Sequence, residues 1–101
     1  MASLCFCPTL QEIHEIRRLI GRSGKVYEGL GALSTINNLT TIRALMLELA
    51  PTRTLEIGMA YGGSALAFAQ THKDLGSEPT EQHIAIDPAQ SKHWDDTGRL
   101  A

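Results

Sequence analysis

The first apolar pattern along the chain has the spacing of an amphipathic helix. Thr9 and Glu12 form a T-x-x-E capping box behind Pro8, which is a common signature of a helix start. The apolar positions that follow recur at helical spacing, at Leu10, Ile13, Ile16, Leu19 and Ile20. We therefore predict a helix that runs to Ile20 and is ended by Gly21.

A second helix is predicted after a glycine-rich interval. Residues 21–34 contain four glycines and predict a mobile connector or a surface loop. Beyond them, Ser34 or Thr35 can cap a helix that Pro51 would end. One face of that helix is apolar, at Ile36, Leu39, Ile42, Leu45, Met46 and Leu49.

After Pro51 the pattern changes to short apolar runs separated by turns. We predict a short buried strand over 53–57, a helix over 64–72, a loop over 74–79 and a second strand over 83–86. That order is a right-handed strand–helix–strand unit with parallel strands. Two parallel strands alone would both be edges. We therefore expect the N-terminal part of a larger α/β domain, or a partner chain that supplies the missing strands.

The composition limits the classes of partner. The chain has 101 residues, of which 43% are hydrophobic and 20% charged, as in a small soluble globular domain. Its formal net charge of -2 and scattered basic residues predict no nucleic-acid surface. No apolar run approaches the roughly 20 residues that cross a bilayer, and no signal peptide is recognisable. We expect a cytoplasmic protein without a membrane partner.

Two further groups of residues contain metal-ligand types, but we do not expect either of them to bind a metal ion. Cys5 and Cys7 are expected to be reduced thiols. His93, Asp95 and Asp96 stand close together, but residues adjacent in sequence rarely converge on one ion. The sequence therefore predicts no metal site.

The stretch "TLEIGMAYGGSALAF", residues 54–68, places an acid before a glycine turn, and such turns often face a nucleotide. Gly58 and Gly63 have the spacing of a phosphate-binding P-loop. However, Ser64 and Ala65 stand where that motif requires Lys and Ser or Thr. Without the lysine, no cation would face the terminal phosphates of a nucleoside triphosphate.

A dinucleotide fingerprint, G-x-G-x-x-G, fits only in part. Ala60 replaces the glycine that lets the backbone approach a pyrophosphate, and the Glu56 carboxylate would lie near that doubly charged group. Asp87, the acid after the second strand, lies 29 residues beyond Gly58, where about 20 is usual. An NAD-type domain is therefore the less favoured alternative.

S-adenosylmethionine suits the same residues better. It has no phosphate, and its methionine end carries an ammonium, a carboxylate and a sulfonium cation. Glu56 would favour a cationic neighbour, directly or through water. Asp87 has two oxygens that could accept hydrogen bonds from both ribose hydroxyls. Glu56 and Asp87 stand at the carboxyl ends of adjacent parallel strands, which is where ligands bind in open α/β sheets.

"LEIGMAYGGSALAFA" followed by "HIAIDP" resembles the first two motifs of class I S-adenosylmethionine-dependent methyltransferases, over roughly residues 34–97. More closely, the sequence resembles the small-molecule O-methyltransferases, including the catechol-type enzymes, whose first motif reads E-x-G-x-x-x-G-x-S. Glu56, Gly58, Gly62 and Ser64 satisfy it. Ala60 departs from the commoner E-x-G-x-G-x-G form but not from this variant.

The resemblance implies a role for each cofactor-binding residue. Glu56 would lie near the methionine amino group, with Ser64 at the same end. Gly58 and Gly62, with Ala60 between them, would let the loop pass the ligand. Asp87 would bind the ribose. Pro88 would pack against the adenine edge.

Two aromatic residues keep alternative interpretations. Tyr61 would either line the pocket or cover the helix. Trp94 would close over the adenine or, as we prefer, anchor the next helix in the core.

By this resemblance, the fold is the N-terminal part of a Rossmann-like methyltransferase domain. Residues 1–33 would form an N-terminal helix and connector, and residues 34–101 a partial S-adenosylmethionine-binding domain. The expected activity is methyl transfer to an oxygen of a small molecule. The family's catalytic base lies in its second half, so no catalytic residue is assigned. The alternative is a non-catalytic assembly module, with its open strand edges paired to a partner such as a second copy.

Overall fold

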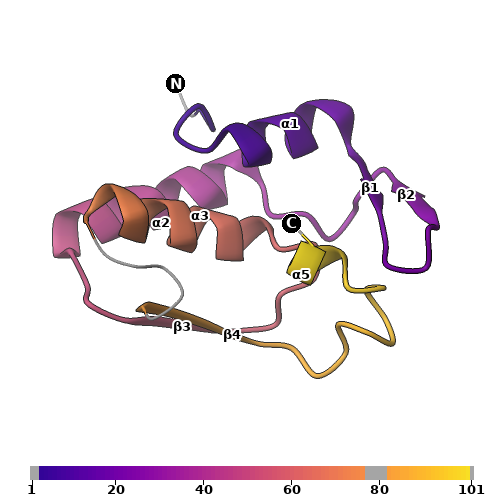
Figure 1. Cartoon of the computed structure of the whole chain (residues 1–101). Coiled ribbons are helices and arrows are strands. Elements are labelled where there is room, and N and C mark those ends of the chain that lie inside the picture. Colours follow the sequence, from indigo (N-terminus) through magenta and orange to yellow (C-terminus); the bar gives the residue numbers. More distant parts are fainter. Residues whose placement is uncertain (1–2, 77–81, 101) are drawn as a thin grey trace.

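The computed structural model describes residues 3–76 and 82–100 as a mixed α/β arrangement (Figure 1). Residues 77–79 of the predicted loop over 74–79 lie outside these residues, and Asp74 is still the last residue of a helix. The described elements, in chain order, are α1 (Pro8–Ile16), β1 (Arg18–Ile20), β2 (Val26–Glu28), α2 (Ile36–Leu49), β3 (Thr54–Ile57), α3 (Gly63–Asp74), β4 (His83–Ile86) and α5 (Thr97–Leu100).

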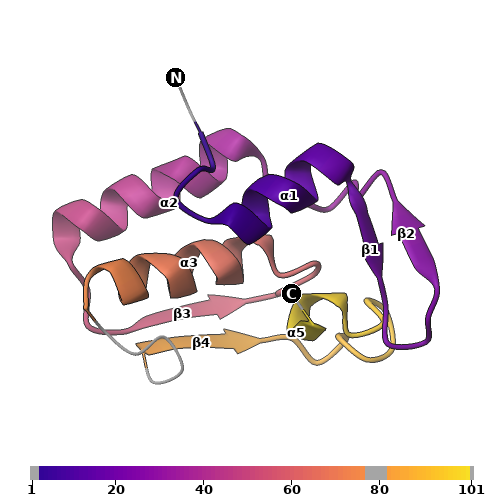
Figure 2. The same cartoon turned by 45° about the horizontal axis from the view of Figure 1, so that its top comes forward.

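Strands β3 and β4 pair in parallel, with Thr54 opposite His83 and Ile57 opposite Ile86. Helix α3 connects them in sequence and lies next to this two-stranded sheet, and α2 packs against α3 (Figure 2). The predicted parallel strand–helix–strand order is therefore confirmed. The carboxyl ends of both strands point toward the same edge of the molecule.

The two faces of the β3–β4 sheet differ in burial. Thr54, Glu56 and His83 face α3: Thr54 and Glu56 are hydrogen-bonded to His72 and Ser64, and the His83 ring stacks on Phe68. The alternate positions face the opposite way and are between 49% and 82% exposed, at Leu55, Ile57, Ile84 and Ile86. The prediction of a buried strand is therefore wrong for this face, because the described residues place no second layer against it.

Helix α2 has the predicted bounds. The hydroxyl of Thr35 accepts a hydrogen bond of 3.1 Å from the backbone N–H of Asn38, which caps the first turn. The helix ends at Leu49, just before Pro51. Its buried residues Leu39 and Met46 face the interior.

The N-terminal helix is shorter than predicted. It begins at Pro8, so Thr9 lies inside the first turn and forms no cap. It ends at Ile16, because Arg17 adopts a left-handed φ of 54° and its guanidinium donates a 2.7 Å hydrogen bond to the Gly29 carbonyl. Leu19, predicted as helical, instead lies in β1.

An antiparallel hairpin joins the end of the predicted first helix to the interval predicted as a connector or loop. Strand β1 pairs with β2, with Leu19 opposite Tyr27. The turn between the strands is bonded to the segment before α5. Arg22 pairs with Asp96, and both Ser23 and Tyr27 donate to Asp95. We call this set of contacts the hairpin latch.

Two clusters of apolar side chains form the core. The first joins α1 to α2 and α3, through Leu4, Cys7, Leu10, Leu39 and Ala67. The second lies beneath the hairpin and includes Ile13, Leu30 and Leu33. Among the helices that the structure describes, none has the length and apolar character needed to cross a membrane.

Candidate functional site

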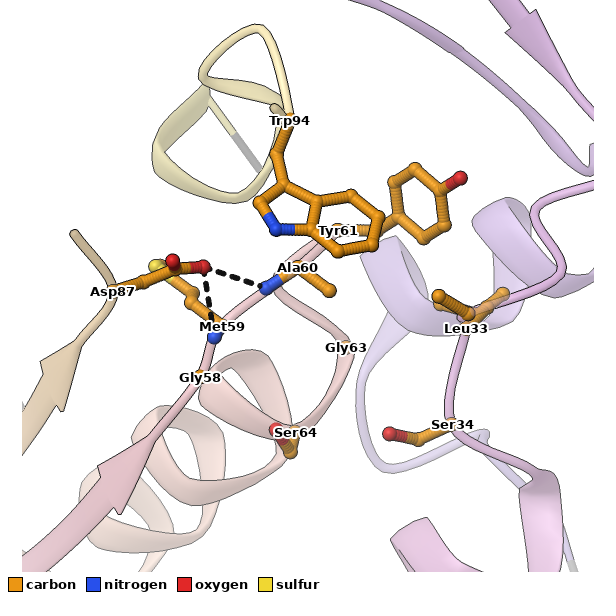
Figure 3. Close-up of a pocket in the computed structure, with 11 residues that line it drawn as sticks. Leu33, Ser34, Gly58, Met59, Ala60, Tyr61, Gly63, Ser64, Asp87 and Trp94 are labelled. Carbon is orange, nitrogen blue, oxygen red and sulfur yellow. Dashed lines mark hydrogen bonds between the residues drawn. The ribbon is translucent and has the colours of Figure 1, made fainter. Parts of the chain in front are cut away.

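A pocket of about 200 Å³ lies at the carboxyl ends of β3 and β4 (Figure 3). Three parts of the chain form it: the loop from β3 into α3, the residues after β4, and the segment before α2. The lining residues are Ala32, Leu33, Ser34, Gly58, Met59, Ala60, Tyr61, Gly63, Ser64, Asp87 and Trp94. Five of the predicted cofactor residues are therefore brought together: Gly58, Ala60, Tyr61, Ser64 and Asp87.

The loop between β3 and α3 alternates into the left-handed backbone region. Gly58 has φ 87°, Ala60 φ 47° and Gly62 φ 85°. Glycine adopts these angles at little cost, whereas a side chain makes the left-handed region unfavourable by roughly 1–2 kcal/mol per residue. The loop therefore carries backbone strain at Ala60.

The Asp87 carboxylate holds this loop in place. Its Oδ2 accepts hydrogen bonds from the backbone N–H groups of Met59 (3.0 Å) and Ala60 (3.1 Å) (Figure 3). Its Oδ1 accepts from the backbone N–H of Ala89 at 3.0 Å. The side-chain amide of Gln90 and these backbone donors lower the pKa of Asp87, against the opposing effect of burial. Asp87 is thus an ionised acid with most of its acceptor capacity already used within the protein.

Gln90 is a structural residue of the site that the sequence reasoning missed. It is buried, and its amide group donates to the Ala60 carbonyl at 2.6 Å and to Asp87 Oδ2 at 2.9 Å. Its carbonyl oxygen accepts from the backbone N–H of Gly98 at 3.1 Å. Gln90 therefore ties the glycine loop to the start of α5. The only sequence signal is its position three residues after Asp87.

Glu56 lies behind the pocket and does not line it. Its Oε2 accepts a hydrogen bond of 2.5 Å from the Ser64 hydroxyl, and its Oε1 lies 3.3 Å from His83 Nε2. Only Ser64 of these three lines the pocket. The negative charge of Glu56 is therefore presented to the pocket through Ser64.

Tyr61 and Trp94 form an aromatic wall on one side of the pocket. Their rings meet edge to face, with centroids 5.2 Å apart and an interplanar angle of 78°. Tyr61 lines the pocket and also packs against the core cluster of Ile13, Leu30 and Leu33. Trp94 is half-buried at the pocket rim and not in the core, contrary to the preferred prediction.

Besides Glu56, two more predicted residues, Gly62 and Pro88, lie outside this pocket. Gly62 is buried as the residue that precedes α3, and it lines a neighbouring hollow of about 510 Å³. Pro88 is exposed and lines neither. The wall formed by Ala32, Leu33 and Ser34 was missed, because it reaches the pocket only through tertiary packing.

The charge of the site favours a cationic or hydrogen-bond-donating ligand. Among the described residues that line the pocket, none is Lys or Arg. Asp87 is ionised, and Glu56 lies behind Ser64. The first turn of α3, at Gly63 and Ser64, adds backbone N–H groups that have no partner within the helix. These donors suit a carboxylate, so the pocket offers complementary partners to both charges of a zwitterion.

The acids predicted to hold no metal have other partners. Asp95 and Asp96 belong to the hairpin latch, and Asp96 is also near Arg99, at 3.7 Å. The described parts of the chain contain no group of three or more His, Cys, Asp or Glu residues arranged to hold an ion.

The pocket lies at the carboxyl edge of the strand–helix–strand unit, which is where ligands bind in open parallel α/β sheets. No protein-family model, curated protein or solved structure matches the chain. The chemistry of the pocket is therefore the basis for a functional proposal.

Proposed function

We propose that the chain is the cofactor-binding portion of an S-adenosylmethionine-dependent methyltransferase that acts on a small molecule. One observation carries the proposal: Gly58 and Ser64 of the E-x-G-x-x-x-G-x-S loop line a pocket at the carboxyl ends of two parallel strands, together with Asp87 after the second strand. In the class I methyltransferases that the sequence resembles, these two motifs bind the cofactor at the carboxyl ends of the strands.

The methionine end of the cofactor fits the α3 side of the pocket. Its ammonium would lie against Ser64, which is backed by Glu56 at 2.5 Å. Its carboxylate would accept hydrogen bonds from the first backbone N–H groups of α3. The absence of Lys and Arg from the described lining fits a ligand whose sulfonium is itself a cation.

The adenosine end fits the Asp87 side. Asp87 Oδ1 accepts one bond within the protein, from Ala89, and retains acceptor capacity for a ribose hydroxyl. Asp87 Oδ2 is occupied by Met59, Ala60 and Gln90. The proposal that both ribose hydroxyls bind Asp87 is therefore narrowed to a single contact at Oδ1. Trp94 supplies an aromatic face nearby.

The size of the pocket implies a conformational step. Ligand pockets usually enclose about 300–1,000 Å³, and this one encloses about 200 Å³. We propose that Trp94, which is half-buried at the rim, moves outward when the cofactor enters. The transfer itself would consist of attack by an acceptor oxygen on the sulfonium methyl, helped chiefly by in-line positioning of the two reactants.

The test is calorimetric titration of the protein with S-adenosylhomocysteine, beside separate titrations with ATP and NAD. Glu56→Gln removes the charge behind Ser64 with little change in shape, and Glu48→Gln on exposed α2 is the matched control. We expect saturable binding of S-adenosylhomocysteine that Glu56→Gln weakens and Glu48→Gln preserves. Binding of ATP or NAD without binding of S-adenosylhomocysteine would refute the proposal.

The exposed face of the β3–β4 sheet favours a second candidate, an assembly module. Four aliphatic side chains gather there, at Leu55, Ile57, Ile84 and Ile86. Both strands also have an unpaired edge within the described residues. We propose that a second copy of the chain or another part of an α/β domain covers this face. The two functions are compatible, because the pocket lies at the strand ends and not on this face.

A further inference from the structure

Behind the pocket, five side chains form a continuous line of hydrogen bonds from α3 through the sheet and back to α3. His72 Nε2 lies 2.8 Å from the Thr54 hydroxyl, and that hydroxyl lies 2.7 Å from His83 Nδ1. His83 Nε2 lies 3.3 Å from Glu56 Oε1, and Glu56 Oε2 accepts from Ser64. We call His72, Thr54 and His83 the relay.

The Thr54 hydroxyl has one hydrogen, so it can donate to only one of its two histidine neighbours. If it donated to His72, then His72 would carry its proton on Nδ1. That atom is buried and has no hydrogen-bond partner within residues 3–76 and 82–100, so an N–H group there would be left unsatisfied. If Thr54 donates to His83 Nδ1, His72 Nε2–H donates to Thr54 and only a lone pair of His72 is left without a partner.

The contact between His83 and Glu56 favours the same arrangement, in which Thr54 donates its hydrogen to His83 Nδ1. A neutral His83 that accepts at Nδ1 carries its proton on Nε2, which faces Glu56 Oε1. The opposite tautomer of neutral His83 would set a bare nitrogen lone pair against a carboxylate oxygen. Burial, and next the nearby His83, lower the pKa of His72, which agrees with a neutral His72. With both histidines neutral, all three contacts are satisfied together in one arrangement only.

We propose that the relay is a positioning device that fixes Ser64 as a hydrogen-bond acceptor toward the pocket. His83 Nε2–H donates to Glu56 Oε1, and both oxygens of Glu56 then act as acceptors. Because Glu56 Oε2 then has no hydrogen to give, the single Ser64 hydrogen is committed to it. Ser64 presents only lone pairs to the ligand. The ligand group at this end is therefore a hydrogen-bond donor, and the cationic ammonium of an amino acid is the donor that Glu56 favours most.

Packing around His83 also makes it a positioning residue. Its ring stacks on Phe68, with centroids 4.5 Å apart and an interplanar angle of 14°. Its side chain is 6% exposed. The ring is thus held on the α3 side of the sheet, with both nitrogens directed to the partners named above.

The first experiment requires no ligand. Long-range ¹H–¹⁵N correlation spectra of the uniformly labelled protein, at about pH 7.5, report which ring nitrogen of each histidine carries the proton. We expect the Nε2–H tautomer for both His72 and His83. Thr54→Ser should preserve both tautomers, whereas Thr54→Val should release His72 from its single tautomer. An Nδ1–H tautomer at either histidine of the wild-type protein would overturn the proposal.

The second experiment rests on the proposed function and uses two nucleosides. S-adenosylhomocysteine carries the ammonium, and 5′-methylthioadenosine lacks it. His83→Phe removes the donor to Glu56 but keeps a ring to stack on Phe68, and His83→Gln restores a donor. We expect His83→Phe to weaken S-adenosylhomocysteine about tenfold without changing 5′-methylthioadenosine, and His83→Gln to recover most of the loss. Equal weakening of both ligands by His83→Phe would overturn the role of the relay.

The two experiments separate the two claims. If the wild-type protein binds neither nucleoside, the proposed function fails, and the tautomers alone decide whether the relay has the stated direction. If the nucleosides bind and the tautomers differ from those expected, the cofactor site stands and the relay is rejected.

Discussion

The Asp87 carboxylate at the end of β4 accepts a 3.1 Å hydrogen bond from the backbone N–H of Ala60, a residue held at a left-handed φ of 47°. The acid after one strand thus fixes the turn after the other strand. The bond also explains how a residue with a side chain is held in a conformation that usually needs glycine. The same acid that is proposed to meet the ligand therefore also shapes the loop around it.

Replacing the strained alanine should stabilise the protein. Ala60→Gly relieves the left-handed conformation, and we expect the free energy of unfolding to rise by about 1 kcal/mol. Ala69→Gly, in the interior of α3, is the matched control and should lower it by about 0.5–1 kcal/mol. Urea unfolding followed by fluorescence measures both. A loss of stability in Ala60→Gly would contradict the strain assigned to this loop.

Acidification should destabilise the protein through His72. Burial and the nearby His83 lower the pKa of His72 from 6.5 in the folded state. Below about pH 6.5 the unfolded chain therefore binds a proton that the folded protein excludes. The stabilisation is complete above this pH and is lost as the pH falls toward the lowered pKa. The pKa of His14 is lowered too, chiefly by burial, and adds to the effect.

We expect His72→Gln to reduce the loss of stability between about pH 7.5 and about pH 5.5, in unfolding experiments with urea. Exposed His93→Gln is the control and should keep the wild-type loss. If His72→Gln lost as much stability as the wild-type protein, the buried neutral state of His72 would be refuted.

The hairpin latch should control the exposure of Trp94. Trp94 directly precedes Asp95 and Asp96, which have left-handed φ angles of 50° and 56° and are bonded to the hairpin. Tyr27→Phe removes one of these bonds and should lower the free energy of unfolding by about 1 kcal/mol. Asp95→Ala removes all the side-chain bonds of Asp95 to the hairpin and should have a larger effect.

The chain has one tryptophan, so its fluorescence reports the pocket rim directly. We expect acrylamide to quench Trp94 more strongly in Asp95→Ala than in the wild-type protein. Asp74→Ala breaks a surface pair with Arg43 and is the control, with quenching unchanged. Unaltered quenching in Asp95→Ala would show that the hairpin does not hold Trp94 in place.

The apolar sheet face should mediate association. Ile57 is 82% exposed and Ile84 57% exposed on the face opposite α3. The double variant Ile57→Lys, Ile84→Lys should shift sedimentation equilibrium toward the monomer, because burial of a lysine charge at a contact is costly. Ile20→Lys, on exposed β1, is the control and should leave the equilibrium unchanged. A wild-type protein that is monomeric at all concentrations would argue against a second copy as the partner.

The sequence predicts the elements that depend on local pattern. Helix α2 and strands β3 and β4 are correct because periodic apolar residues and nearby breakers define each of them. The β1–β2 hairpin was not predictable in this way. Leu19 and Ile20 continue the helical spacing of α1, but they lie in β1 because the chain turns at Arg17. The hairpin is also held by contacts distant in sequence, such as that of Ser23 with Asp95, 72 residues further along the chain.

In the site, too, the sequence predicts the residues set by local pattern and misses those set by tertiary packing. The glycine loop and Asp87 were predicted because parallel strands bring their carboxyl ends together. The contacts of the two acids could not be predicted from the sequence. Glu56 lies behind Ser64, and most acceptor positions of Asp87 are taken by hydrogen bonds from the loop and from Gln90. Gln90 and the wall at Leu33 depend on tertiary packing, which one sequence does not encode in any local pattern.

Site-specific binding is the most direct test of the proposed function. In ¹H–¹⁵N correlation spectra, titration with S-adenosylhomocysteine should shift the backbone signals of Gly58, Ala60 and Ser64 and the indole N–H signal of Trp94. The shifts should saturate together at one ligand per chain. If these four signals stayed unchanged at saturating ligand, or if the shifts were confined to other parts of the chain, the assignment of the pocket as an S-adenosylmethionine site would be contradicted.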